Sequence, residues 1–414
     1  MTSEYTYLKR VKVNTANLEL GMYVSELDKK WSDSPFLFQG FPLSTEDDIL
    51  EVQKECRWVY VDFKSREAYH AYLKSKANPD FSGSQEEVKS RLNNELSFEL
   101  PRANSYYKSS RKLVKDVMQS VLNDEDFDLN SVKVAVEDCI ESILSNQDAL
   151  LLLSNIKNAD EYTAEHCLRV AIMAIAFGRY VGFEEEDLKC LGIGALLHDV
   201  GKMKVPDKIL NKPGKLTPAE FNIMKDHAIE GFKILKRKPA LSEIAIDIAH
   251  SHHERLNGEG YPRKIQSHQI SKYTRLVTIV DTYDAVTSER IYSSAKSPST
   301  AFGILRDNAG KHFDKELVEK FIEWMGIYPV GSLVELKTGE VGIVLKVYQA
   351  QKLKPRILLV TDEKKESGYE KVVDLSHMAV HSSGSLYQVK SVLPNGAYGI
   401  NLENFITDGL VAHQ

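Results

Sequence analysis

The stretch Ala195-Leu196-Leu197-His198-Asp199-Val200-Gly201-Lys202 ends a run of small and apolar residues that begins at Leu188. Such a run predicts a buried helix, and Gly201 suits the C-cap of that helix. An imidazole and a carboxylate follow each other directly at the helix end, where the backbone turns. Both side chains can therefore bind one metal ion there, and the carboxylate can also bridge two ions.

Four further features place imidazoles or carboxylates at the edges of apolar segments. His166 lies in an apolar helical segment, and His227 comes after a loop rich in lysine and proline. His252 and His253 follow another apolar helical segment, and Asp281 directly follows the apolar run 276–280. Mixed nitrogen and oxygen ligation of this kind suits Fe, Mn or Zn better than Ca or Mg.

Together with Gly260-Tyr261-Pro262, this ordered set closely resembles the HD-GYP domain, the branch of the HD phosphohydrolases that opens the cyclic dinucleotide c-di-GMP. The resemblance runs from about residue 160 to residue 321, and it includes the segments 205–207, 212–217 and 284–288. It implies an all-helical, metal-dependent phosphodiesterase domain. The implied product is the linear dinucleotide pGpG, and slow continuation to GMP stays open.

The resemblance also implies a centre for two divalent metal ions, with Fe or Mn as the expected metals. Asp199 would bridge both ions, and the other ligands would be His166, His198 and Asp281 on one ion and His227, His252 and His253 on the second. Two such ions bind phosphate oxygens and lower the pKa of a water toward about 7. Some family members bind a third ion through a glutamate one turn before the first histidine, but Tyr162 stands there in this chain.

The resemblance assigns substrate contacts to three places. Lys202 would stabilise charge near the scissile phosphate or protonate the leaving group, and its competing interpretation is a lysine that complements a helix dipole. Gly260-Tyr261-Pro262 would shape the pocket, position the histidine pair and serve as a surface for protein partners. Arg290 would hold the substrate phosphate, but Ser293 replaces a second basic residue that the family often carries.

Two alternatives to a c-di-GMP phosphodiesterase follow from these residues. Ser293 leaves open a phosphodiesterase that prefers cyclic GMP-AMP. A catalytically silent receptor for cyclic dinucleotides is the competing class of protein. Family members of that class lose metal ligands, whereas all seven ligand positions are filled in this chain.

The chain length and the changes of hydrophobic pattern along the sequence predict several domains in a mainly α protein. A chain of 414 residues with 43% hydrophobic residues can form two or three cores. We expect a small α+β module over 1–74, a linker over 75–100, a catalytic domain with a helical lead-in over 101–326, and a β-rich segment over 327–414. The first module resembles a domain of unknown function that often precedes HD-GYP domains, with a regulatory role or simple packing as open interpretations.

Periodicity gives the elements of these domains. Strands are expected over 10–13, 21–24 and 58–62, with a short capped helix from Ser44 to Glu55 between the last two. In the β-rich segment, strands are expected over 331–336, 341–347 and 357–360, with weaker signals over 369–373 and 386–389. The helical pattern resumes at Gln85, and in the lead-in it repeats at Val114, Val117, Met118, Val121 and Leu122. That face either packs on the catalytic core or forms a homodimer.

Composition excludes several classes of function. The formal net charge is −6 and no basic face is evident, so a nucleic acid polymer is a poor partner. The start of the chain lacks the apolar core of a signal peptide, and no apolar stretch reaches the ~20 residues of a membrane helix. Four widely spaced cysteines form no CxxC pair, which indicates free thiols in a reducing compartment. We therefore expect a cytoplasmic protein.

Overall fold

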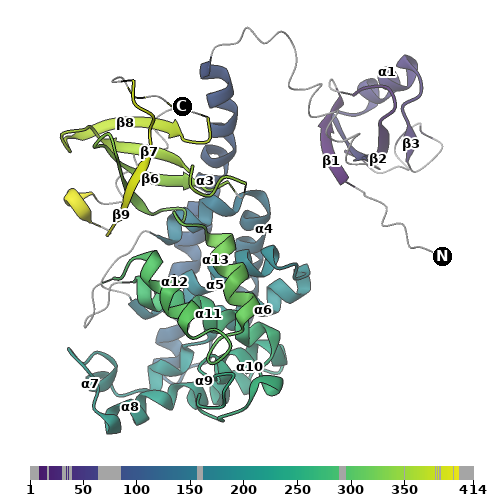
Figure 1. Cartoon of the computed structure of the whole chain (residues 1–414). Helices are drawn as coiled ribbons and strands as arrows, with labels where there is room; N and C mark the ends of the chain where they lie inside the picture. Colours follow the sequence, from purple (N-terminus) through teal and green to yellow (C-terminus); the bar gives the residue numbers. More distant parts are fainter. Residues whose placement is uncertain are drawn as a thin grey trace. The chain divides into compact units, whose positions relative to one another are not determined.

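The computed structural model describes residues 9–63, 85–155, 162–288 and 295–400, apart from gaps at 16–17, 30–33, 35, 37–39, 349, 378, 380, 382–383 and 395. The chain forms two compact units, Met1–Ser90 and Arg91–Gln414 (Figure 1). Most of the described chain is helical, with a small sheet in the first unit and a second sheet near the C-terminus. The predicted fold class is therefore confirmed.

The first unit is a four-stranded antiparallel sheet with one helix. Its strands follow the order β1 (Lys9–Asn14), β4 (Trp58–Phe63), β2 (Tyr23–Leu27) and β3 (Phe41–Pro42), and its helix is α1 (Glu46–Glu55). Thr45 and Asp48 form the capping box that starts α1. Val52 of the helix is buried with Val24, Val59 and Val61 of the sheet, so the α+β module has a core of its own.

Two long helices lead into the site-bearing part of the second unit. They are α3 (Gln85–Leu122), which contains Pro101, and α4 (Leu129–Ser154). Because α3 begins at Gln85, the later part of the segment expected as a linker is helical. Val114, Val117, Met118 and Val121 are buried in the same core as the later helices, whereas Leu122 is exposed. The lead-in therefore packs on the catalytic core.

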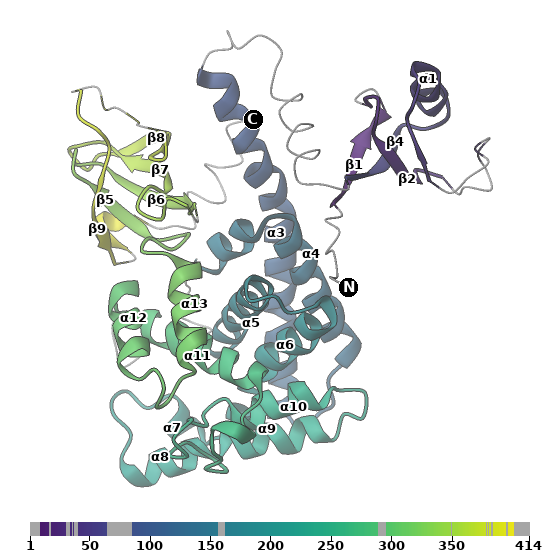
Figure 2. The ribbon, with the colours of Figure 1, turned by 45° about the vertical axis from the view of Figure 1, so that its right-hand side comes forward.

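Short helices follow in close succession (Figure 2). They are α5 (Tyr162–Tyr180), α6 (Glu185–Leu197), η4 (Val200–Lys204), α7 (Asp207–Leu210), α8 (Pro218–Lys225), α9 (His227–Lys236), α10 (Glu243–Ser251), η5 (Ser267–Gln269), α11 (Lys272–Thr287), α12 (Pro298–Asp307) and α13 (Lys315–Met325). Buried α6 packs against α4, α5 and α10. Within the described ranges, each helix is too short or too polar to span a lipid bilayer.

Gly201 does not cap α6 as the sequence suggested. The residue after the helix is His198, in right-handed helical geometry, and Gly201 lies within the 3-10 turn η4. A Cβ atom on Gly201 would lie 2.0 Å from the carbonyl oxygen of His227 and 2.4 Å from the nitrogen of Gly231. The glycine is therefore needed because the backbone of α9 passes directly beside it.

The C-terminal sheet has five antiparallel strands and two buried faces. Its order is β8 (Ser367–Asp374), β7 (Arg356–Thr361), β6 (Val341–Lys346), β5 (Leu333–Leu336) and β9 (Val389–Leu393). Leu358 and Val360 join the helical core, whereas Ile357 and Leu359 face a separate core. The last strand starts where the weak signal over 386–389 ends, and the other predicted strands are confirmed. Figures 1 and 2 place this sheet at one end of the unit and α7 and α8 at the other.

Candidate metal centre

The seven predicted metal ligands come from five separate elements. His166 lies in the first turns of α5, and His198 and Asp199 follow α6 directly. The remaining ligands are His227 at the start of α9, His252 and His253 just after α10, and Asp281 within α11. All are buried except His253, which is partly buried. Apolar helix packing thus brings together residues that are up to 115 positions apart in the chain.

Asp199 lies between two sets of imidazoles. Its Oδ1 is 3.4 Å from His227 Nε2 and 3.8 Å from His252 Nε2. Its Oδ2 is 3.6 Å from His166 Nε2 and 3.3 Å from His198 Nε2. Each oxygen therefore faces its own pair of nitrogens, which is the arrangement of a carboxylate that bridges two ions.

The last two ligands complete these sets. His253 belongs with Asp199, His227 and His252, whose ligand atoms all lie within 4.8 Å of one another. Asp281 Oδ1 lies 3.1 Å from His166 Nε2 and 3.9 Å from His198 Nε2, so it joins the other set. The structure brings all seven predicted ligands together in the grouping that the resemblance implied.

Unpartnered buried atoms show that the centre fits a cation. Among the described residues, His198 Nε2 and Asp199 Oδ1 are buried without a hydrogen-bond partner. Such atoms are costly to leave unsatisfied in a folded protein. One cation on each side of Asp199 would satisfy both atoms, because His198 Nε2 faces Oδ2 and Oδ1 faces His227 and His252. The mixed set of imidazoles and carboxylates suits divalent transition metals.

Backbone carbonyls fix the orientation of three imidazoles. The Nδ1 atoms of His198 and His227 lie 2.7 Å from the carbonyl oxygens of Ala195 and Met224, and His252 Nδ1 lies 3.1 Å from that of Ala249. Because a carbonyl only accepts, each Nδ1 must carry the proton. In a neutral ring, Nε2 then carries a lone pair that faces the Asp199 side of the centre, where it can bind a metal ion.

Burial and neighbouring charges set the pKa values in the centre. Burial lowers the pKa of His252 to about 3 and also lowers the pKa of His227 and His253, so these rings are neutral at neutral pH. Burial alone would lower the pKa of His198, but the adjacent Asp199 carboxylate raises it well above its usual value. Burial would raise the pKa of Asp199, but Lys202 and the imidazoles hold it well below its usual range.

Comparison with known proteins identifies the family. An HD domain model matches residues 140–317, and a model described as a domain of unknown function (DUF3391) matches residues 10–132. A cyclic di-GMP phosphodiesterase of Pseudomonas aeruginosa is 32% identical over 352 residues, which cover 84% of this chain and 84% of that protein. The chain belongs to the HD-GYP family of cyclic di-GMP phosphodiesterases.

Two further relatives match a shorter part of the chain. A cyclic di-GMP phosphodiesterase of Thermotoga maritima and a 3'3'-cGAMP-specific phosphodiesterase of Vibrio cholerae are each 36% identical over 177 residues. The match covers 42% of this chain, 48% of the Thermotoga protein and 34% of the Vibrio protein. The HD domain implies dependence on divalent metal ions.

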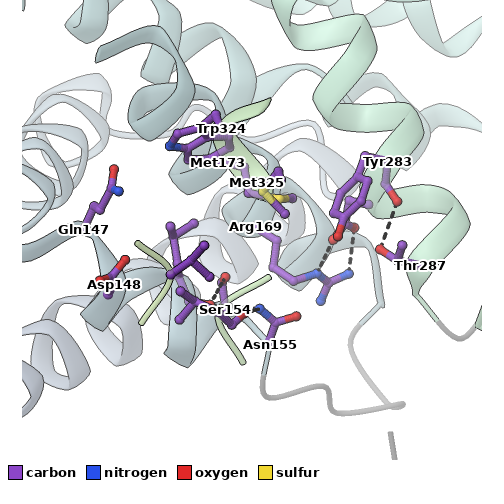
Figure 3. Close-up of a pocket in the computed structure, with 14 residues that line it drawn as sticks. Gln147, Asp148, Ser154, Asn155, Arg169, Met173, Tyr283, Thr287, Trp324 and Met325 are labelled. Atoms are coloured by element: carbon purple, nitrogen blue, oxygen red, sulfur yellow. Dashed lines mark hydrogen bonds and ion pairs between the residues drawn. The ribbon is translucent and has the colours of Figure 1, made fainter. Parts of the chain in front are cut away.

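A buried ion-pair chain supports the first histidine of this HD-GYP centre. His166 Nδ1 lies 2.7 Å from Asp284 Oδ2, and Arg169 holds both Asp284 oxygens at 2.8 Å and 3.0 Å. Figure 3 shows Arg169 reaching from α5 toward the part of α11 that carries Tyr283 and Thr287. Glu165 lies 3.6 Å from Arg169 and 2.8 Å from Arg111 of the lead-in helix α3. The chain of charges thus connects the lead-in to a metal ligand.

Sequence reasoning did not assign roles to Asp284 and Arg169. Asp284 opens the segment 284–288, which contributed to the resemblance without a stated function. Arg169 is a charged residue in an apolar helix, three positions after His166, and both members of the pair are buried. Because a buried charge requires a partner, the position of Arg169 in an apolar helix was the signal that could have indicated this ion pair.

A cavity of about 850 Å³ opens beside the centre. Among its lining residues are Lys202, His227, His253, Tyr261 and Asp281. The Lys202 Nζ atom donates a hydrogen bond to Asp199 Oδ2 at 2.5 Å, and a fifth of the Lys202 side chain is exposed. The α3 residues Lys115, Met118 and Gln119 line the same cavity, so the lead-in forms part of its wall.

The loop formed by Gly260, Tyr261 and Pro262, called the GYP loop below, packs tightly against His252 and His253. A Cβ atom on Gly260 would lie 2.4 Å from the nitrogen of Arg255, so this position requires glycine. The Tyr261 nitrogen donates to the carbonyl of His253 at 3.2 Å, and the two rings are 4.7 Å apart. The buried Glu254 carboxylate accepts hydrogen bonds from the nitrogens of the residues at 263–265, which follow Pro262. The loop therefore holds His253 in place.

Three residues that the sequence analysis singled out are not described by the structure. Arg290, Ser293 and the side chain of Tyr162 lie outside the described residues.

Proposed function

We propose that this HD-GYP protein hydrolyses cyclic di-GMP to linear pGpG in the cavity beside Asp199. The observation that carries the proposal is the position of Asp199, with one oxygen toward His227 and His252 and the other toward His166 and His198. A phosphodiester repels an attacking hydroxide, and two adjacent cation sites counter that repulsion. The cavity of about 850 Å³ has the size of a small-molecule site.

We infer that the centre takes two divalent ions, with Fe or Mn as the metals that suit its donors best. Asp199 would bind both ions, with His166, His198 and Asp281 on one side and His227, His252 and His253 on the other. Bound there, the ions supply positive charge for phosphate oxygens and lower the pKa of a water. The protein contributes donors that are already oriented, because the backbone fixes the Nδ1 protons of His198, His227 and His252.

Lys202 is the residue we assign to the reacting phosphate. Its ammonium group lies at the boundary between the buried Asp199 carboxylate and the cavity. From this position it can place a fixed positive charge beside a phosphate oxygen. It can also donate a proton from Nζ to the ribose oxygen that leaves as the ring opens.

Contacts with the substrate and with protein partners follow from the family resemblance. We propose that Gly260, Tyr261 and Pro262 shape the substrate pocket, that Arg290 binds a substrate phosphate, and that the GYP loop is also a surface for protein partners. The helical lead-in is proposed as a surface for a homodimer, through the faces of α3 that do not pack on the catalytic core. Light scattering of the purified chain tests the dimer, which is contradicted by a monomeric mass across the accessible concentration range.

A preference for cyclic GMP-AMP is the second candidate. Ser293 stands where the family often has a second basic residue, and the matching Vibrio protein is named a 3'3'-cGAMP-specific phosphodiesterase. The two substrates differ in one base, so the same metal chemistry would serve both. A direct comparison of kcat/KM on the two substrates decides between them.

The test is turnover with product identification. Protein loaded anaerobically with Fe(II) or Mn(II) would be given c-di-GMP or cyclic GMP-AMP, with Asp199→Asn as the control. We expect pGpG from c-di-GMP and a loss of turnover of at least about 10³-fold in the variant, because the bridging carboxylate is lost. A fully metallated wild-type protein that binds c-di-GMP without cleaving it would instead be a receptor.

A further inference from the structure

A second cluster of potential metal ligands lies in the C-terminal sheet, away from the catalytic centre. It consists of Glu340, which ends the turn between β5 and β6, Glu363 in the turn between β7 and β8, and His381 in the β8–β9 connection. One ligand atom from each residue lies within 4.8 Å of the other two. Because β5, β6 and β7 alternate in direction, both turns lie at the same end of the sheet.

Local packing holds the three residues together. A Cβ atom on Gly339 would lie 3.1 Å from the carbonyl oxygen of Glu363, so the two turns touch through their backbones. The Lys365 ammonium donates to the carbonyl of Gly339 and to Glu335, which ties the turns together without using Glu340. The nitrogen of His381 donates to the carbonyl of Ser385 and its ring packs on Tyr387, which fixes the third residue.

Glu340 is the residue that indicates a ligand. Only 2% of its surface is exposed, and among the described residues its Oε2 atom is buried without a hydrogen-bond partner. Its other oxygen, Oε1, lies 3.3 Å from His381 Nε2. A buried carboxylate oxygen with no partner is unfavourable, and it points to a cation that this end of the sheet is built to receive.

Charge and spacing favour a metal ion over a simple ion pair. Two carboxylates face one imidazole, which can supply at most one positive charge, whereas a divalent ion balances both. Ligands at about 2.0–2.1 Å in a tetrahedral zinc site lie about 3.3 Å from each other, as Glu340 Oε1 and His381 Nε2 do. Glu363 is 2.8 Å from the same nitrogen, and its exposed side chain has room to adjust.

We propose that Glu340, Glu363 and His381 bind a divalent transition-metal ion at the end of the C-terminal sheet, with Zn²⁺ as the probe and solvent as the fourth ligand. Three protein donors of nitrogen and oxygen type are a common set for zinc. The ion would connect two turns and the long β8–β9 connection. Its role would be structural, because neither the cavity nor the seven catalytic ligands include these residues.

The test is a zinc count on the full chain in an Asp199→Ala background, which weakens the catalytic centre. The added substitutions are His381→Ala and the isosteric Glu340→Gln. The matched control is His377→Ala, since His377 lies in the same connection with 72% of its side chain exposed. We expect each ligand variant to lose about one tightly bound Zn²⁺ per chain relative to the control, with loss of the tetrahedral absorption bands of Co²⁺.

Thermal unfolding gives an independent readout. Zn²⁺ should raise the Tm of the His377→Ala control more than that of Glu340→Gln, because only the control keeps the site. If His381→Ala fails to fold, the isosteric Glu340→Gln variant still decides the question. An equal zinc count and an equal Tm response in Glu340→Gln and in the control would show that the cluster is an ion pair and would overturn the proposal.

Discussion

Individual side chains determine how the catalytic centre binds metal ions and the substrate phosphate. The seven ligands could be identified from sequence because their order, together with Gly260-Tyr261-Pro262, resembles the motif set of the HD-GYP family. Asp284 and Arg169 were not, because their pairing joins residues 115 positions apart and is specified by packing alone. Sequence motifs can thus reveal a metal ligand, whereas the side chains that hydrogen-bond to that ligand are determined by how the helices pack.

Asp284→Asn is expected to weaken metal binding without removing a ligand. The carboxylate fixes the Nδ1 proton of His166 and is held by Arg169, and loss of such a partner lowers metal affinity about 10–100-fold. The dissociation constant for Mn(II), measured by competition with a chelating dye, checks this. Asp187→Asn is the control, because Asp187 accepts from Tyr273 and Lys272 in the first turn of α6, at the opposite end of that helix from the ligands. Equal affinities in the two variants would contradict the positioning role.

Lys202→Gln is expected to lower kcat about 10²–10⁴-fold while the metal content stays unchanged. The reason is that the ammonium of Lys202 contacts Asp199 and faces the cavity but belongs to neither ligand set. Steady-state kinetics and metal analysis on the same preparation check both halves. Lys204→Gln serves as the control, since Lys204 pairs with the exposed Asp124. A kcat near that of the control would contradict the catalytic role and would leave Lys202 as a lysine that complements a helix dipole.

Among the elements, the contact between η4 and α9 determines where His227 lies. Sequence reasoning gave the helices and strands well because apolar periodicity and turn residues were clear. It assigned Gly201 to a helix cap because a cap needs only local information, whereas the close approach of α9 involves residues about 30 positions away. The last strand was placed early for a similar reason: Val389 pairs with Leu336 across the sheet, which the local pattern does not reveal.

Gly201→Ala is expected to separate η4 from α9 and to lower both stability and metal affinity. An added methyl group would overlap the backbone of His227 and Gly231, and overpacking of this kind costs about 1–3 kcal/mol or more. Thermal unfolding of the metal-free protein measures the loss. Gly303→Ala is the matched control, since a Cβ atom at that position of α12 meets no atom within 4 Å. A Tm equal to that of the control would contradict the contact.

For the molecule as a whole, pH couples to metal binding through one histidine. Burial keeps the pKa of His252 at about 3 and lowers that of His227 and His253, so these rings bind metal without losing a proton. The Asp199 carboxylate raises the pKa of the buried His198 well above its usual value, so a proton competes with the metal there. In the metal-free protein this pairing stabilises the fold at lower pH and is lost as pH rises through the raised pKa.

The predicted result is an apparent metal affinity that rises with pH until His198 is deprotonated and then levels off. Calorimetric titration in buffers of different ionisation enthalpy should detect release of about one proton from His198 per chain at neutral pH. Metal binding that releases no proton and does not change between about pH 6 and pH 9 would contradict this assignment of charge.

The sequence predicted the division into an α+β module, a helical catalytic part and a β-rich segment. It did not predict how closely the helical part and the β-rich segment would be connected, because the sheet shares the helical core only through alternate residues such as Leu358 and Val360. The cavity wall formed by Lys115 and Gln119 of the lead-in was also not predictable, since those residues are ordinary polar positions of an amphipathic helix.

The metal content of three ligand variants tests most directly whether the Asp199 carboxylate serves two metal sites. All would carry His381→Ala, so that the count reports the catalytic centre alone. We predict about two ions per chain with the seven ligands intact, about one after His166→Ala or His252→Ala, and close to none after Asp199→Ala, because only Asp199 serves both sites. Retention of one ion after Asp199→Ala, or loss of both ions after either histidine substitution, would contradict a centre bridged by this carboxylate.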